Sequence, residues 1–293
     1  MKLFYRNKVG MKMNIEKNSK CYNYEKIEFN KGIFDEICDA CYIIHLEDNG
    51  RLKNVKKQLY ELPLCKNTII CHNKGFKKCN KELRYDKSNY DLIDAYMQIY
   101  NDAIKKEYDG IIILEDDFIY ENDLFNPIHQ NKIIKFIQKK KNQDFIYTFG
   151  VMPFLQTFNI TKFDLFHHYV ILSGGLHSVY YSKKAIENIY EKRNKMTDID
   201  AYLNATYFYK KYGYVLPLIT QTFPETDNSK NWTLAKNIGL YSVLKPLLEY
   251  FELHKSTKNY KIFYITSIIL FSLLMNISTF VLYSIVMSIV ALF

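Results

Sequence analysis

Residues 109 to 123 read DGIIILEDDFIYEND, in which four aliphatic residues lead directly into three carboxylates. A strand of four consecutive aliphatic residues has no polar side for solvent, so it must be covered on both faces. Glu115, Asp116 and Asp117 at its end repel one another, and burying an unpaired carboxylate costs several kcal/mol. These residues must therefore be solvated or neutralised by a positive charge, and a divalent cation is one candidate.

Strands and helices are predicted to alternate around this acidic strand. Buried strands are expected over 41–48, 66–73 and 144–150, and helices over 50–62, 90–108 and 129–141. A strand, a helix and a strand in succession give parallel neighbours in one sheet. The pattern is typical of an α/β protein with helices on both faces of its sheet. Ligands in such sheets bind beyond the carboxyl ends of the strands, where the three carboxylates lie.

The alternation of side chains along a strand directs Glu115 and Asp117 to one side and Asp116 to the other. Two carboxylates separated by one residue can share a cation, and their hard oxygen atoms suit Mn²⁺ or Mg²⁺ better than zinc. Few protein ligands would also leave room for phosphate oxygens. The alternative interpretation is a solvated loop whose acidic residues only cap a helix.

The C-terminal residues 262–293 contain no charged side chain, which exceeds the length that a transmembrane helix needs. One helix of this length would measure about 48 Å against a hydrocarbon core of about 30 Å, so we expect it to tilt, protrude or break near Asn276. Lys255, Lys258 and Lys261 precede it, and the positive-inside tendency places the large N-terminal part in the cytosol. The prediction is a single-pass C-terminal tail anchor, and the alternative is a buried core helix.

The cysteines and the N-terminus agree with a cytosolic domain. All six cysteines lie in the first 79 residues, and Cys38 and Cys41 form a CxxC pair. Cys41 opens an apolar strand rather than a helix, which does not suit a thioredoxin-type site, and the other spacings do not suit zinc. We expect reduced structural thiols, which are typical of the cytosol. The N-terminus has no apolar segment of the kind found in signal peptides.

The net charge of +9 is compatible with an anionic membrane, a phosphorylated substrate or nucleic acid. The lysines are scattered along the sequence, and no zinc finger or other nucleic-acid signature accompanies them. We therefore predict no nucleic-acid partner.

Several segments resemble a known family in their order and spacing. Residues 42–59 carry Leu46, Arg51, Gln58 and Leu59 after an apolar strand, and residues 112–117 read IILEDD. Later landmarks are the Gly-rich turn and helix of 173–189, TDIDAYLN at 197–204, and LPLITQTFPETDNSKNW at 216–232. Over roughly residues 40 to 232 the chain resembles the lipopolysaccharide-biosynthesis glycosyltransferases of family 25, whose relatives include collagen galactosyltransferases.

The resemblance implies a GT-A-like, Rossmann-like mixed sheet and a metal-dependent hexosyltransferase. Such an enzyme moves a sugar from a nucleotide-sugar donor, here a UDP-sugar, to a hydroxyl of a glycan, lipid or protein acceptor, with inversion. Glu115 and Asp117 would hold the metal, with His177 as a third ligand, and Asp200 would be the general base. Residues expected around the donor are His45, Glu47, Arg51, Asn73, Asp116, Gly174 and Gly175.

The sequence differs from the family pattern at three positions. His45 stands where the family often carries Asn, and Ala95 and Tyr96 stand where it carries a Ser-His pair. Donor contacts, acceptor choice or activity itself can therefore differ. One alternative is a membrane-anchored, catalytically decayed scaffold that keeps the fold and loses metal-dependent donor binding. Another is a metal-dependent phosphodiesterase or nuclease, which would need further metal ligands on other strands.

These expectations divide the chain into four parts. They are a polar N-terminal extension (1–38), a glycosyltransferase-like catalytic domain (39–235), a helical juxtamembrane linker (236–261) and a transmembrane anchor (262–293).

Overall fold

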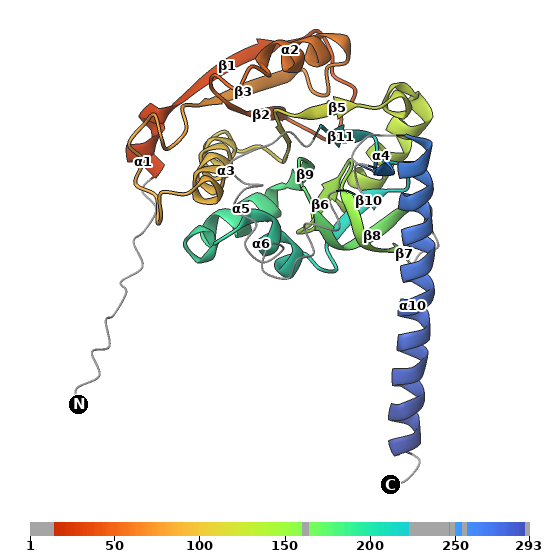
Figure 1. The fold of residues 1–293 in the computed structure, drawn as a ribbon. Helices are drawn as coiled ribbons and strands as arrows, with labels where there is room; N and C mark the ends of the chain where they lie inside the picture. Colours follow the sequence, from red (N-terminus) through yellow and green to blue (C-terminus); the bar gives the residue numbers. More distant parts are fainter. Residues whose placement is uncertain (1–14, 160–163, 223–245, 247–249, 254–256, 291–293) are drawn as a thin grey trace, which may run out of the picture.

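The computed structural model describes residues 15–159, 164–222, 246, 250–253 and 257–290 (Figure 1). These residues form a nine-stranded mixed sheet with the order β1-β3-β2-β4-β9-β6-β10-β8-β7, and a separate two-stranded sheet of β5 and β11. The strands are β1 (Tyr22–Glu28), β2 (Ala40–Leu46), β3 (Asn67–Asn73), β4 (Gly110–Glu115), β5 (Phe118–Tyr120), β6 (Ile146–Thr148), β7 (Met152–Asn159), β8 (Asp164–Gly174), β9 (Ser178–Ser182), β10 (Lys211–Tyr214) and β11 (Ile219–Gln221).

The helices connect these strands. They are α1 (Ile15–Asn18), α2 (Leu52–Glu61), α3 (Ser88–Lys105), α4 (Pro127–Lys140), α5 (Lys183–Glu191), α6 (Ile199–Thr206) and α10 (Lys258–Val290). The predicted helices at 50–62, 90–108 and 129–141 are confirmed as α2, α3 and α4, and the predicted strands are confirmed as β2, β3 and β6.

The parallel part of the sheet lies around β2. Both β3 and β4 pair with β2 in parallel, so that Ile43 lies opposite Ile70 on one side and Leu114 on the other. The predicted parallel unit of two strands and a helix is therefore confirmed. Beyond β4 the sheet is mixed, because β9 runs antiparallel between β4 and β6.

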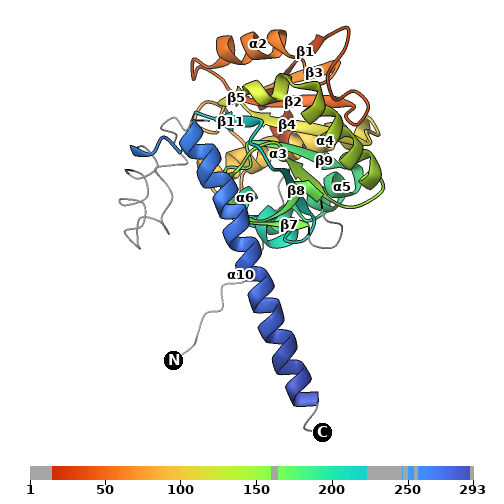
Figure 2. The same ribbon diagram turned by 90° about the vertical axis from the view of Figure 1, so that its right-hand side faces the viewer.

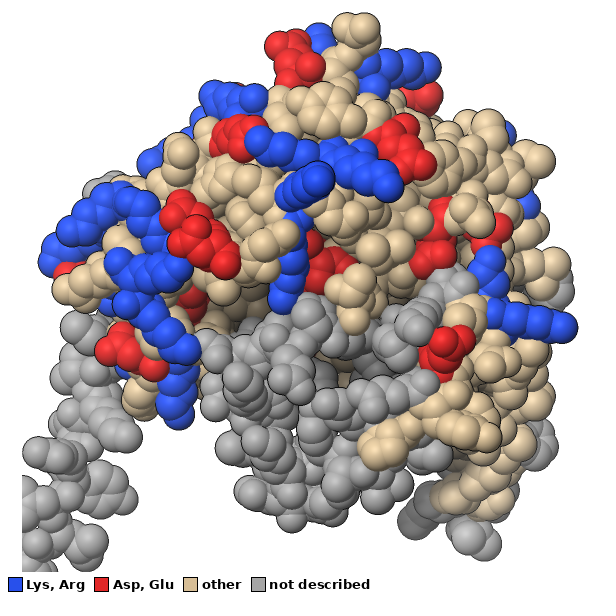
Figure 3. All heavy atoms as spheres, turned by 45° about the horizontal axis from the view of Figure 1, so that its top comes forward, with Lys and Arg blue, Asp and Glu red and all other residues tan. Residues whose placement is uncertain are grey.

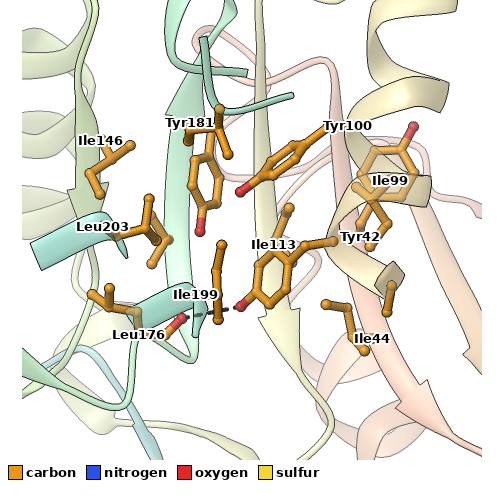
Figure 4. Close-up of a cluster of buried hydrophobic side chains, with 14 of the residues drawn as sticks. Tyr42, Ile44, Ile99, Tyr100, Ile113, Ile146, Leu176, Tyr181, Ile199 and Leu203 are labelled. Atoms are coloured by element: carbon orange, nitrogen blue, oxygen red, sulfur yellow. Dashed lines mark hydrogen bonds between the residues drawn. The ribbon is translucent and has the colours of Figure 1, made fainter. Parts of the chain in front are cut away.

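The four aliphatic residues of β4 divide between two hydrophobic cores. Ile111 and Ile113 pack with α3, α5 and α6 on one face, and Ile112 and Leu114 pack with α2 and α4 on the other. Figure 4 shows the first core, in which Tyr42 and Tyr100 approach Ile113 from neighbouring elements. A mixed α/β sheet with helices on both faces is thus confirmed, and the continuous aliphatic run is explained by burial on both sides.

The predicted polar extension over residues 1–38 is wrong from residue 15 onward, because α1 already packs on the domain through the hydrogen bond from Asn18 to Asp94. Tyr22–Glu28 forms β1, which pairs antiparallel with β3 at the edge of the main sheet. Residues 1–14 of that extension lie outside the described residues. β1 alternates buried and exposed positions only weakly, so its sequence carried little strand periodicity.

The expectation of reduced thiols throughout is also wrong. Pairing of β1 with β3 brings Cys21 to Cys79, and the two form a disulfide. The remaining cysteines, Cys38, Cys41, Cys65 and Cys71, are buried and unbridged. A disulfide is unusual in cytosolic proteins, so the cysteines no longer favour a cytosolic domain.

The C-terminal helix α10 is long and apolar enough to cross a membrane, and it is the only such helix in the described parts of the chain. It begins beside β5 and β11, passes β7 and extends beyond the domain (Figures 1 and 2). It continues through Asn276 without the break that the sequence allowed. The predicted linker over 236–261 lies mostly outside the described residues.

The apolar span of α10 that is long enough to cross a membrane is Lys258–Ser278, and its first turns also contact the domain. The Tyr260 hydroxyl donates to Val151 O at 2.8 Å, and the Tyr264 hydroxyl donates to Tyr214 O at 3.0 Å. Ile268 is fully buried in the same core. The stretch from 273 to 290 carries exposed leucine, isoleucine and valine side chains and measures about 27 Å, close to the hydrocarbon thickness of about 30 Å.

Candidate functional site

The acidic turn lies at the carboxyl end of β4, beside the end of β2. The Glu115 amide donates to His177 O at 2.9 Å, and the Thr222 amide donates to Asp117 O at 3.0 Å. The chain then enters β5, which pairs with β11. The turn is therefore held between the start of β9 and the end of β11, two segments far away in the sequence.

Asp116 is enclosed by donors from the loop after β2. Its Oδ2 atom accepts from His45 Nδ1 at 2.9 Å, Leu46 N at 3.0 Å and Asn49 Nδ2 at 2.5 Å. Its Oδ1 atom accepts from Arg51 Nη1 at 2.7 Å. Burial alone would raise the pKa of Asp116, but the hydrogen bonds and the Arg51 charge outweigh it and lower the pKa. Asp116 is thus a fixed anion inside the protein.

This network changes the expected roles of three residues. His45 and Arg51 both bind Asp116 rather than face open space, and Asp116 takes the second of its two expected roles, supporting the site from behind instead of facing the ribose. The sequence interpretation missed Asn49, which also accepts from the Arg51 amide at 3.0 Å. The Asp-Asn-Gly turn is a signal that could have identified it, since Asp48 and Gly50 both have positive φ.

Glu115 lies among groups that oppose its ionisation. The Tyr96 hydroxyl donates to Glu115 Oε1 at 3.2 Å. Burial, followed by the negative charges of Asp117 and Asp200, raises the pKa of Glu115 well above its ordinary value, although the Tyr96 hydrogen bond acts in the opposite direction. Tyr96 therefore contributes a hydroxyl that contacts the acidic cluster.

The Asp117 carboxylate has one oxygen atom without a hydrogen-bond partner within the described part of the chain. This atom, Oδ1, is buried. Burial, together with the neighbouring Asp116 charge, raises the pKa of Asp117 to about 6, although Arg51 acts in the opposite direction. A carboxylate in this environment is stabilised by a cation.

Asp200 reaches the same cluster from α6. The backbone amides of Leu176 and Gly175 hydrogen-bond to its carboxylate. Burial and the nearby Asp198 raise the pKa of Asp200 to about 6, while those hydrogen bonds and Lys211 partly offset the increase. Asp198 caps α6 by accepting from Ala201 N at 2.9 Å, so Asp200 is not the capping residue.

Lys211, which sequence reasoning missed, is a buried cation on the far side of Asp200. Its ammonium donates to Ser173 Oγ at 3.0 Å and to Asn204 Oδ1. Burial lowers the pKa of Lys211 to about 7, and the Asp200 charge acts against that shift. An isolated lysine on a strand gives no sequence signal for this contact.

His177 does not have the geometry of a metal ligand. Its Nδ1 lies 2.7 Å from Gly175 O and its Nε2 lies 3.0 Å from Ile219 O, so both ring nitrogens face carbonyl oxygens. Neither lone pair is directed at the acidic cluster, and the expected third ligand is not supported. Gly175 has a φ of +62°, and a side chain there would also contact Gln221. Gly174 ends β8 and pairs with Met152.

Asn73 and Glu47 were expected near the donor. Asn73 is instead part of a buried polar network, because its Oδ1 accepts from Lys81 Nζ at 2.6 Å and from Gly75 N at 2.7 Å. The Glu47 amide donates to Asn73 O at 2.9 Å, and its partly exposed side chain follows the end of β2. The structure thus assigns Asn73 to the scaffold, and it places Glu115 within electrostatic range of both Asp117 and Asp200.

Charges of both signs cover the face shown in Figure 3. Lysine and arginine side chains alternate there with acidic ones and do not form one continuous basic surface. The absence of a nucleic-acid partner stays a prediction.

Comparisons with known proteins give little guidance. No family model matches the sequence, and no curated protein matches it. Among solved structures, the chain is similar to A197 from STIV, with 14% identity and a TM-score of 0.38 over 64% of this chain and 86% of that chain. A likeness at this level supports no argument about function.

Proposed function

We propose that this protein is a membrane-anchored, metal-dependent glycosyltransferase that takes a UDP-sugar as donor. The observation that carries the proposal is the meeting of Glu115, Asp117 and Asp200, which lie up to 85 positions apart in the sequence. Burial is the largest cause of their raised pKa values, and neighbouring carboxylates add to it. The sequence resemblance supplies the reaction class.

The residues fit a divalent cation with hard oxygen ligands. Glu115 and Asp117 would hold Mn²⁺ or Mg²⁺, and the unpartnered Asp117 Oδ1 is the atom best suited to it. The described residues contain no group of three His, Cys, Asp or Glu side chains arranged to hold a metal. Two carboxylates are enough where substrate phosphates complete the coordination. The bound metal would stabilise the charge that develops on the departing nucleotide.

Asp200 is the group that would take the proton from the acceptor hydroxyl. With a pKa of about 6, it is ionised near neutral pH and still basic enough to accept a proton. The Gly175 and Leu176 amides fix its orientation, and Lys211 stabilises its ionised form. Inversion, as the resemblance implies, needs one such base and one in-line displacement.

The C-terminal helix would anchor the domain to a membrane. Lys261 forms an ion pair with Asp123, which lies six positions beyond Asp117, so the start of α10 is joined to the candidate site region. The apolar segment from residue 273 onward would cross the bilayer.

A decayed scaffold is the second candidate function. The observation in its favour is that protein donors occupy both oxygens of Asp116, and that Tyr96 holds Glu115. Such a protein would keep these contacts without binding a donor.

Binding measurements on the full-length protein in detergent test the proposal. We expect calorimetry to detect a UDP-sugar only when Mn²⁺ is present, and we expect Asp117→Asn to abolish this binding. Asp48→Asn is the matched control, since Asp48 is exposed and pairs only with Lys78 at 2.7 Å. Binding that is unchanged in Asp117→Asn would overturn the metal assignment. Absence of binding to a UDP-sugar panel would favour the scaffold, and hydrolysis of a phosphodiester would favour the nuclease.

A further inference from the structure

Two of the unbridged cysteines lie side by side at the amino ends of neighbouring strands. Cys38 precedes β2 and Cys65 precedes β3, and these strands run in parallel. The two strands therefore begin at the same edge of the sheet. The Cys38 and Cys65 Sγ atoms are 2.7 Å apart.

This separation is too short for two unrelated thiols. Heavy atoms that are not bonded are most stable about 3.5–4.0 Å apart, whereas a disulfide bond measures about 2.05 Å. The side chains are also enclosed, because Cys38 is 5% exposed and Cys65 is 0% exposed. They pack with Phe34 and Ile70 in the core that lies under α2 and α4. Only a small movement of the two side chains separates this arrangement from a covalent bridge.

We propose that Cys38 and Cys65 form a second disulfide, in addition to the one between Cys21 and Cys79. The oxidant would be the disulfide of a thiol oxidoreductase. One cysteine thiolate attacks that disulfide and releases one donor thiol, and the second cysteine thiolate then displaces the other. The new S–S bond forms as the donor becomes a dithiol, so two electrons and two protons leave the pair.

The exchange must take place before the core closes. Burial raises the pKa of the Cys65 thiol well above its ordinary value, and thiolate is the reactive form. The folded domain also gives a donor protein no access to a side chain that is 0% exposed. The bridge therefore forms during folding, in a compartment that supplies disulfides.

The two bridges would fix both ends of β3. Cys65 lies just before β3 and would tie it to the start of β2, while Cys79 lies after β3 and ties that loop to the start of β1. The oxidising compartment implied by both bridges is opposite to the cytosolic placement expected from the lysines. The Cys38 pair lies at the amino ends of the strands, so it does not contact the acidic site at their carboxyl ends.

Thiol counting on the full-length protein tests the bridge. Protein from membranes prepared with an alkylating agent is unfolded, alkylated without reductant and analysed by mass spectrometry. We expect labels on Cys41 and Cys71 alone, and labels on all cysteines after reduction. Labels on Cys38 and Cys65 without reductant would overturn the proposal, whether or not Cys21 and Cys79 are also labelled.

Three single variants and one double variant distinguish a bridge between Cys38 and Cys65 from other pairings of the cysteines. Cys41→Ser should retain the bridge and leave Cys71 as the labelled thiol, whereas a bridge through Cys41 would expose new thiols. Cys38→Ser and Cys65→Ser should each lower the thermal midpoint, and the double variant should lower it no further, because either change breaks the same bond. If the decrease in thermal midpoint of the double variant equals the sum of the two single decreases, Cys38 and Cys65 are independent thiols and not a bridge. UDP-sugar binding should persist in these variants, which separates this test from that of the proposed function.

Discussion

Two clusters of carboxylates lie beyond the carboxyl ends of the parallel strands, and they differ in how their charge is neutralised. The first, which we call the Lys81 cluster, contains Lys81, Asp91, Asp94, Tyr22 and Asn73. The buried Lys81 ammonium donates to Asp91 Oδ1 at 2.5 Å, to Asn73 Oδ1 and to the Tyr22 hydroxyl, and lies 4.0 Å from Asp94. The Tyr22 hydroxyl in turn donates to Asp94 at 2.8 Å.

The second cluster consists of Glu115, Asp117 and Asp200. Lys211 acts on Asp200 through its charge, Arg51 is already bound to Asp116, and Asp117 keeps an oxygen without a partner among the described residues. Helix α3 serves both clusters, since it supplies Asp91 and Asp94 to the first and Tyr96 to the second. Buried acids alone therefore do not identify a site. A cluster with its own cation is a structural element, and one without it can bind a cation.

The largest expected effect is on the Lys81 cluster. Lys81→Met should lower the free energy of unfolding by about 3–5 kcal/mol, because it leaves Asp91 and Asp94 buried without their cation. Lys78→Met is the control, since the exposed pair of Lys78 with Asp48 contributes about 1 kcal/mol or less. Chemical denaturation of the domain in detergent measures both. If both substitutions lower the free energy of unfolding by the same amount, Lys81 does not neutralise a buried cluster as proposed.

Asp200→Asn should act on the reaction and leave binding intact. Loss of the base should lower sugar transfer by a factor of about 10², equivalent to about 2.7 kcal/mol of transition-state stabilisation, with Mn²⁺ and donor affinities unchanged. Asp198→Asn is a close control, because Asn also caps a helix well. If donor affinity falls as much as the rate does, Asp200 is a binding residue.

Asp117→Asn should stabilise the metal-free protein above pH 6. The pKa of Asp117 is raised from 3.8 to about 6 on folding, so ionisation disfavours the folded state progressively between pH 3.8 and about 6, and the full penalty is present above that pH. That shift corresponds to roughly 3 kcal/mol, and solvent near this half-buried group reduces the expected gain to about 1–2 kcal/mol. Denaturation at pH 7.5 and at pH 4 measures it. The gain in the free energy of unfolding should largely disappear at pH 4. A lower free energy of unfolding in Asp117→Asn at pH 7.5 would show that the ionised carboxylate does not destabilise the folded protein.

Protonation should weaken metal binding in the second cluster only. Below its pKa of about 6, Asp117 holds a proton that a cation must displace. The thermal midpoint should therefore rise more with Mn²⁺ at pH 7.5 than at pH 5, with about tenfold weaker affinity at the lower pH. The same titration on Asp117→Asn is the control and should show no such difference. A midpoint shift that is independent of pH would place the cation elsewhere.

Much of the central fold was predictable because burial on both faces leaves a clear sequence pattern. The aliphatic run of β4 and the helical spacing in α2, α3 and α4 each reflect contacts that are local in the sequence. Strand β1 was missed because an edge strand with mostly partly exposed residues lacks that pattern. The Cys21–Cys79 disulfide was missed for the same reason, since only the pairing of β1 with β3 brings its two cysteines together.

Two features could be read from consecutive residues alone: the three carboxylates that follow a buried strand, and the long apolar helix of residues 258–290. The tertiary structure decided which acids are neutralised. Asp116 receives His45 and Arg51 from the loop after β2, and Asn73 receives Lys81, whereas Asp117 receives no cation from the described residues. Neutralisation of a buried charge requires a partner within a few ångströms, and only the fold brings residues that are distant in the sequence to that separation.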